Sequence, residues 1–193
     1  MSIGSIVFLG IVAALAAYVV MIYNGLVNLK HGVSRAWANI DVLLKQRHDE
    51  IPKLVEVCNQ YRQFERETLQ RVVEARARVQ SAREHEDIAA LGSAEGALRA
   101  GLGRLFAVAE AYPELKANEN FLQLQSRITQ LENGIADRRE LYNESVNVNN
   151  VRVEQFPDTF VARLFGFAMR PLLEFPAAEK ADADLQALFR TNR

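Results

Sequence analysis

The stretch that decides the fold reads Ile6-Val7-Phe8-Leu9-Gly10-Ile11-Val12-Ala13-Ala14-Leu15-Ala16-Ala17-Tyr18-Val19-Val20-Met21-Ile22. No charged side chain occurs from Ser2 to Leu29, and the first cation is Lys30. An apolar helix of about 20 residues crosses the roughly 30 Å hydrocarbon core of a bilayer. The sequence therefore predicts a transmembrane helix within residues 1–29.

Two other interpretations of this stretch stay open. Ala14-Leu15-Ala16 resembles the cleavage site of a secretory signal peptide, but no Lys or Arg precedes the apolar core, as a signal peptide requires. The stretch is also long enough for a buried core helix. However, residues 3–22 are apolar on all sides, and a small bundle could hardly cover such a helix.

Basic residues indicate the orientation of the span. Lys30, Arg35, Lys45 and Arg47 follow it, whereas the short N-terminal side has neither Lys nor Arg. Cations close to a span stay in the cytoplasm. We therefore expect the N-terminus outside and the main body in the cytoplasm. The single Cys58 fits this location, because one cysteine cannot form an internal disulfide.

The body of the chain predicts long amphipathic helices. Apolar residues recur at steps of three and four from Leu26 to Val79 and again from Phe121 to Asn149, the pattern of one buried helix face. The segment Asn147-Val148-Asn149-Asn150, which has poor helix propensity, is expected to end the second series. Pro52 predicts a kink or break of the first series near residues 50–52.

A third, glycine-rich helix lies between these two series. Asp87 is its expected N-cap, and Asn118 is the expected N-cap of the helix that follows. Its glycines predict either low rigidity or a close backbone approach to a neighbour. The fold class that follows is all-α, with an N-terminal transmembrane helix that continues into an antiparallel up-and-down helical bundle of long helices.

We divide the chain into three parts. Residues 1–29 hold the N-terminal segment and the transmembrane helix, residues 30–157 form the bundle, and residues 158–193 form a short amphipathic helix and a C-terminal tail. Asp158 is the expected N-cap of that short helix, which should run from Thr159 to about Phe167.

No standard catalytic motif occurs in the sequence: it lacks a P-loop, His-Glu-x-x-His and Gly-x-Ser-x-Gly. Cys58 lies on the apolar stripe with no nearby histidine, so it is interpreted as a packing residue. His85 lies between Glu84 and Glu86, but consecutive helix residues diverge and converge poorly on one metal ion. We therefore expect no enzyme, no cofactor and no metal site. The net charge of −1, with acids and bases interleaved, argues against nucleic acid as a partner.

Two surfaces are candidates for interactions. A polar run that includes Lys45 and Arg47 precedes Ile51-Pro52, and it is either a solvated face or a docking patch for a partner or for lipid headgroups. The apolar tail from Phe160 to Phe175 either forms a contact between copies or dips into the membrane interface. The candidate interaction residues are Lys45, Arg47, Phe160, Leu164, Phe165 and Phe167.

Several short motifs follow the span in order. They read Tyr23-Asn24-Gly25-Leu26-Val27, Trp37-Ala38-Asn39-Ile40-Asp41-Val42-Leu43-Leu44-Lys45-Gln46-Arg47, Ile51-Pro52-Lys53-Leu54-Val55, Glu74-Ala75-Arg76, Tyr112-Pro113-Glu114-Leu115-Lys116-Ala117-Asn118-Glu119-Asn120-Phe121, Leu131-Glu132-Asn133, Arg138-Arg139, Tyr142-Asn143 and Phe156-Pro157. This set resembles the LemA family of bacterial membrane proteins from Tyr23 to about Phe175. The run from Gln46 to Glu50 departs from the family, which usually shows two basic residues and then Asp-Leu.

The resemblance implies a bacterial inner-membrane protein with one N-terminal span and an antiparallel helical bundle. Relatives in magnetic bacteria contribute to magnetosome membranes, and family members often lie beside genes for membrane proteases. The resemblance supplies no catalytic residues.

We therefore expect a non-catalytic membrane-anchored scaffold that self-associates, organises partners, or organises the membrane at the cytoplasmic face. The expected partners are the lipid bilayer, further copies of the chain and a membrane protein such as a protease. An adaptor or modulator of a membrane protease or envelope-stress system is the alternative. A metal-dependent enzyme hidden in the bundle has neither a motif nor a ligand pattern in its favour.

Overall fold

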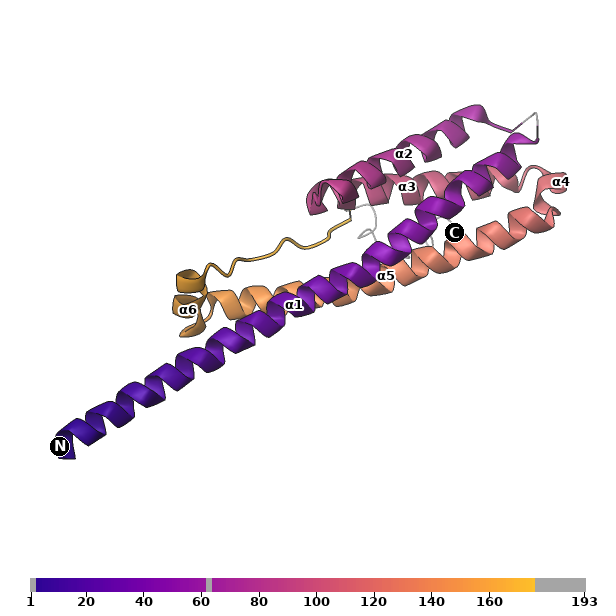
Figure 1. Cartoon of the computed structure of the whole chain (residues 1–193). Helices are drawn as coiled ribbons and strands as arrows, with labels where there is room; N and C mark the ends of the chain where they lie inside the picture. Colours follow the sequence, from indigo (N-terminus) through magenta and orange to yellow (C-terminus); the bar gives the residue numbers. More distant parts are fainter. Residues whose placement is uncertain (1–2, 62–63, 176–193) are drawn as a thin grey trace, which may run out of the picture. The chain divides into compact units, whose positions relative to one another are not determined.

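The computed structural model describes residues 3–61 and 64–175, and these residues form α-helices without any strand. The helices are α1 (Ile3–Asn59), α2 (Arg66–Glu84), α3 (Ile88–Ala109), α4 (Pro113–Lys116), α5 (Glu119–Glu154) and α6 (Asp158–Phe165) (Figure 1). The predicted all-α fold with a long apolar N-terminal helix is confirmed.

The helices are grouped into two compact units. Within the described residues, the first unit contains residues 3–41 and 137–172, and the second contains residues 42–136 and 173–175. Helices α1 and α5 each contribute one segment to both units.

The second unit packs segments of α1 and α5 with α2 and α3. Arg47 of α1 contacts Glu132 of α5, and a Cβ on Gly134 would touch the Leu43 side chain, so residue numbers rise on one helix as they fall on the other. These two segments are therefore antiparallel. Helices α2 and α3 lie side by side across a short turn (Figure 1). The core of the second unit contains buried side chains from all four of these helices: Leu44, Ile51, Leu54, Val72, Leu98, Leu102, Leu105, Phe121 and Ile128.

The expected N-caps at Asp87 and Asn118 are confirmed. The Asp87 carboxylate accepts a hydrogen bond from the backbone N–H of Ala90 at 2.9 Å. The Asn118 side-chain oxygen accepts one from the N–H of Phe121 at 3.1 Å. Each bond satisfies one of the N–H groups that the first turn of a helix leaves without an intrahelical acceptor.

Of the kink or break predicted near residues 50–52, the break is wrong, because α1 continues through Pro52 to Asn59. Proline cannot donate to the carbonyl four residues before it, which here is that of His48. The side chain of Arg76 on α2 replaces the missing donor, since its Nε donates to the His48 carbonyl oxygen at 2.9 Å. A tertiary contact thus keeps this carbonyl paired within the uninterrupted helix.

A glycine of α3 accommodates a second segment of the chain. A Cβ atom built on Gly92 would lie 1.9 Å from the carbonyl oxygen of Glu174, so a larger residue cannot fit without a backbone shift. Leu173, next to this contact, is buried. The close backbone approach expected of the glycine-rich helix is therefore present at Gly92.

Candidate functional site

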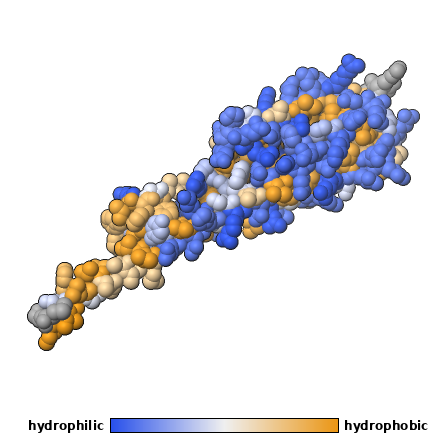
Figure 2. Space-filling model, in the orientation of Figure 1, coloured by the Kyte–Doolittle hydropathy of each residue, from blue (hydrophilic) through white to orange (hydrophobic). Residues whose placement is uncertain are grey.

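The first unit contains the helix that could cross a membrane. Every residue of α1 from Ile3 to Met21 is exposed, and most of this surface is apolar (Figure 2). Among the described residues, α1 is the one helix long and apolar enough to span a bilayer by length and composition. Lys30 and Arg35, the first two cations after this stretch, are also exposed.

Burial begins where the exposed stretch ends. Ile22 and Leu26 are buried, and they form one apolar cluster with Val161 and Ala162 of α6. The ring of Tyr23 packs edge-on against two further aromatic rings, with centroid distances of 4.9 Å to Phe165 and 5.6 Å to Phe167. Helix α6 therefore docks on α1 directly after its exposed apolar stretch.

Contacts at its two ends set the bounds of α6 and join it to α5. Gly166 ends the helix in the left-handed conformation (φ 70°), and the N–H of Phe167 donates to the Ala162 carbonyl at 2.9 Å. The predicted N-cap at Asp158 is wrong, because Pro157 occupies the cap position and makes no side-chain bond to the helix. Asp158 lies inside α6, is buried, and forms an ion pair with Arg152 of α5.

The outer face of α6 is apolar. Phe156, Phe160 and Leu164 follow one another at intervals of four residues, so they share one side of the helix and the turn before it. They are 77%, 65% and 76% exposed. We call these three residues the outer face of α6. Its two phenylalanine rings contact each other with centroids 5.9 Å apart.

The segment after α6 is bound along α5 by polar side chains. Asn150 forms two hydrogen bonds with the backbone of Arg170, at 2.8 and 2.9 Å. The hydroxyl of Tyr142 donates to the Pro171 carbonyl at 3.1 Å, and burial raises the pKa of this phenol. The asparagine run does not end α5, which continues to Glu154, because these side chains bind another segment.

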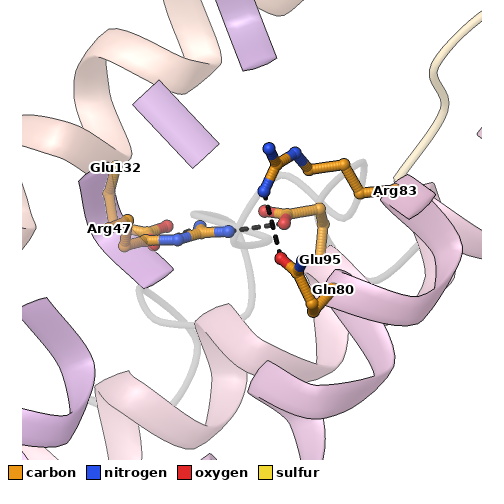
Figure 3. A network of polar contacts seen from close by, with 5 residues as sticks. All are labelled: Arg47, Gln80, Arg83, Glu95 and Glu132. Carbon is orange, nitrogen blue, oxygen red and sulfur yellow. Dashed lines mark hydrogen bonds and ion pairs between the residues drawn. The ribbon is translucent and has the colours of Figure 1, made fainter. Parts of the chain in front are cut away.

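The second unit contains a buried ionic cluster, formed by Arg47, Glu95 and Glu132 (Figure 3). The two terminal nitrogens of Arg47 lie 2.5 Å from Glu95 and 2.6 Å from Glu132. The side chains are 1%, 2% and 17% exposed, in that order. Burial raises the pKa of the Glu95 carboxyl, and the Arg47 guanidinium opposes that rise. The cluster joins α1, α3 and α5 inside the unit.

The candidate interaction residues lie in different environments. Lys45 is exposed, whereas Arg47 is buried, so its guanidinium cannot take part in a docking surface in this conformation. Phe160 and Leu164 lie on the outer face of α6. Phe165 and Phe167 contact Tyr23, with Phe165 still half exposed.

Sequence reasoning missed the two carboxylates of the ionic cluster, although the pattern held a signal. Arg47 fills the gap between Leu44 and Ile51 on the apolar stripe of α1. Glu95 fills the corresponding gap between Leu91 and Leu98 on α3. Opposite charges on two buried stripes indicate an internal ion pair, because buried charges are normally paired.

Two other residues considered for chemistry have structural surroundings. Cys58 is buried, and burial raises the pKa of its thiol to about 12. His85 is exposed, and its Nδ1 lies 2.7 Å from the Ser81 carbonyl oxygen. Within residues 3–61 and 64–175, no three His, Cys, Asp or Glu side chains are close enough to hold a metal ion.

Comparison with known proteins gives one family and several relatives. The model of the LemA family matches residues 36–186. Magnetosome proteins MamQ 1 and MamQ 2 of Paramagnetospirillum magneticum are each 33% identical to the chain over 78 residues, and magnetosome protein MamQ of Magnetospirillum gryphiswaldense is 32% identical over 78 residues. The matched stretch covers 40% of this chain and only 29% of each relative.

Proposed function

The chain belongs to the LemA family, and on that premise we propose that it is a non-catalytic, membrane-anchored helical scaffold. It self-associates or organises partners or membrane at the cytoplasmic face. The observation that carries the proposal is the exposed apolar surface of α1 from Ile3 to Met21, which continues without a helix break into the part of α1 that packs against α6.

The distribution of charge supports a single-pass topology in a bacterial inner membrane. Lys30 and Arg35 follow the exposed apolar stretch, and no cation precedes it. Basic residues next to a span are retained in the cytoplasm. The proposed orientation therefore places the N-terminus outside and both the bundle and α6 on the cytoplasmic side.

The chemistry of the buried polar groups supports a non-catalytic role. Arg47 and Glu95 form a buried ion pair with each other inside the bundle. The thiol of Cys58, with its pKa near 12, is protonated at neutral pH and therefore a poor nucleophile. The similar relatives are named as magnetosome proteins.

Small residues on the exposed stretch of α1 support self-association. Gly10 and Ala14 are four residues apart, as are Ala13 and Ala17, and all four are exposed. Small residues at this spacing allow two transmembrane helices to approach closely. A Cβ on Gly10 would meet nothing within 4 Å, so this position is open within one copy of the chain.

Two measurements on the full chain test the proposal. We expect the protein to stay with membranes through alkaline carbonate extraction and to show more than one copy per particle by light scattering in mild detergent. Replacing Gly10 and Ala14 by leucine should reduce the particle to one copy, because the larger side chains prevent close packing. Val12→Leu, on the same stretch but already large, is the matched control.

The two measurements refute different parts of the proposal. Release of the protein by carbonate would overturn the membrane anchor. A single copy per particle for the unmodified chain would overturn self-association and leave the anchor in place.

A further inference from the structure

We propose that α6 is a second membrane contact, whose outer face (Phe156, Phe160 and Leu164) inserts into the interface of an anionic lipid bilayer. The insertion lies beside the point where α1 leaves that bilayer. This inference rests on the proposed function, because it requires α1 to span a membrane. It adds a specific lipid-binding element that the anchor alone does not require.

The position of α6 along α1 places it at the level of the membrane interface. Residues 3–22 form about 20 residues of helix, or about 30 Å, which matches the hydrocarbon core. The next residues should therefore lie at the interface. Helix α6 packs on Ile22 and Leu26, at this level. Tyr23 lies in the same contact, and tyrosine is enriched at membrane interfaces.

Helix α6 is apolar on two sides, and only one of them is covered by α1. Val161 and Ala162 are buried against α1. The outer face, in contrast, presents two phenylalanines and one leucine that are each at least 65% exposed. Large apolar side chains gathered on one side of a short helix are typical of segments that lie in the plane of the interface. Figure 2 shows apolar surface on this part of the first unit.

The charges around α6 favour anionic lipid. From Glu154 to Leu173 the sequence has two acidic residues: Asp158 is buried and paired with Arg152, and Glu154 is exposed. Arg163 and Arg170 of the same segment are exposed. Two exposed arginines stand against one exposed glutamate, so the net exposed charge of the segment is positive, which is complementary to anionic headgroups. The long side chain of Arg163, on α6 itself, can reach headgroups while the neighbouring apolar groups insert more deeply.

A second copy of the chain fits this surface less well than lipid. A symmetric contact through the outer face of α6 would bring two copies of the same surface together. Arg163 of each copy would then approach a surface on which exposed arginines outnumber the one exposed acidic residue, Glu154, between 154 and 173. Like charges brought together in this way oppose association, so the same charge that attracts lipid disfavours a second copy.

The structure provides a selective way to test the insertion. Cys58 is buried and its thiol is protonated at neutral pH, so a cysteine introduced on the surface can be labelled without it. Leu164→Cys in the full-length chain would carry an environment-sensitive fluorophore. The protein would be placed in vesicles of phosphatidylcholine with or without phosphatidylglycerol. Some of the lipid would carry a nitroxide near the carbonyl end of the acyl chain.

Leu141→Cys provides a matched control within the same unit. Leu141 is also an exposed leucine, 54% exposed, on α5. Its neighbour Tyr142 packs on Trp37, which lies about 22 Å further along α1 than Ile22. We expect the nitroxide lipid to reduce the emission of the label at 164 by about half or more and that at 141 by about a tenth or less, because only the first inserts.

Charge is tested with the same labelled protein. Phosphatidylglycerol should increase the quenching at 164, and the double substitution Arg163→Gln and Arg170→Gln should remove that increase. Quenching that does not depend on phosphatidylglycerol would overturn the preference for anionic lipid.

The remaining outcomes distinguish this inference from the proposed function. An unquenched label at 164 on a chain that floats with the vesicles and resists carbonate overturns the insertion of α6 and leaves the α1 anchor intact. Alternatively, the fluorophore at 164 reports an apolar environment only at high protein density, without quenching by the nitroxide lipid. That result assigns the face to a second copy and also overturns the inference. A chain that does not float with vesicles overturns both proposals.

Discussion

Replacement of Arg47 by methionine (R47M) tests the buried ionic cluster most directly. Methionine retains an unbranched, flexible side chain but removes the charge, so Glu95, 2% exposed, loses the guanidinium 2.5 Å away. Removing one partner of a buried salt bridge destabilises a protein by about 3–5 kcal/mol. Glu132 is 17% exposed and can be hydrated in part, so we expect the cost to arise mainly from Glu95.

The assay is urea unfolding of the full chain in mild detergent, followed by helical circular dichroism. With a denaturant slope of about 2 kcal/mol per molar urea, R47M should lower the midpoint by about 1.5–2.5 M. Lys45→Met removes the same charge two residues away, but from an exposed position, so it should change stability by less than about 0.5 kcal/mol. If R47M costs no more than Lys45→Met, the reasoning about the buried cluster is refuted.

The same variant has a predicted pH dependence. Burial raises the pKa of Glu95, and the loss of Arg47 removes the group that opposes this rise. The folded state then keeps a proton that the unfolded carboxyl, with a pKa of about 4.3, releases. Stability of R47M therefore falls as pH rises above about 4.3 and levels off above the raised folded pKa. Adding Glu95→Gln should remove this dependence, and a flat profile for R47M itself would contradict the argument.

Three further predictions concern single contacts. In thermal unfolding, Gly92→Ala should destabilise the protein by about 1–3 kcal/mol. Gly103→Ala, with open space around the added Cβ, should stabilise it by up to about 1 kcal/mol. Equal effects of the two substitutions would contradict the close approach of Glu174 to Gly92. Cys58 should resist maleimide until urea unfolds the protein, and rapid labelling would contradict its burial. Arg76→Leu should lower the free energy of unfolding by about 1 kcal/mol. In a protein that also carries Pro52→Ala, which restores the backbone donor, the same substitution should lower it by less. Equal losses in the two backgrounds would refute this compensation.

Local patterns in the sequence predicted much of the fold. Steps of three and four between apolar residues identified the long helices, because a buried helix face requires this spacing. Asp87 and Asn118 marked helix starts, because their side chains bond N–H groups three residues away. These signals act within one or two helical turns and can therefore be found without knowledge of the partner elements.

The errors arose where a distant part of the chain changes a local rule. Pro52 leaves the His48 carbonyl without its donor in the helix, and Arg76 satisfies that carbonyl from another helix. Asp158 has the side chain of an N-cap, but an ion pair with Arg152 places it inside α6. The sequence alone indicates a surface cation at Arg47, because its two carboxylate partners are 48 and 85 residues away in the chain.

By itself, the sequence determined that this protein has an apolar N-terminal helix of bilayer length and an all-α body, because an uncharged run and helical periodicity are properties of neighbouring residues. Only the tertiary structure decided which charged groups are buried and where α6 packs. Docking of α6 on Ile22 and Leu26 brings residues about 140 positions apart into contact, and it turns Phe160 and Leu164 outward beside the apolar helix. The composition of the tail cannot specify that position, since the position depends on the surface that α1 offers.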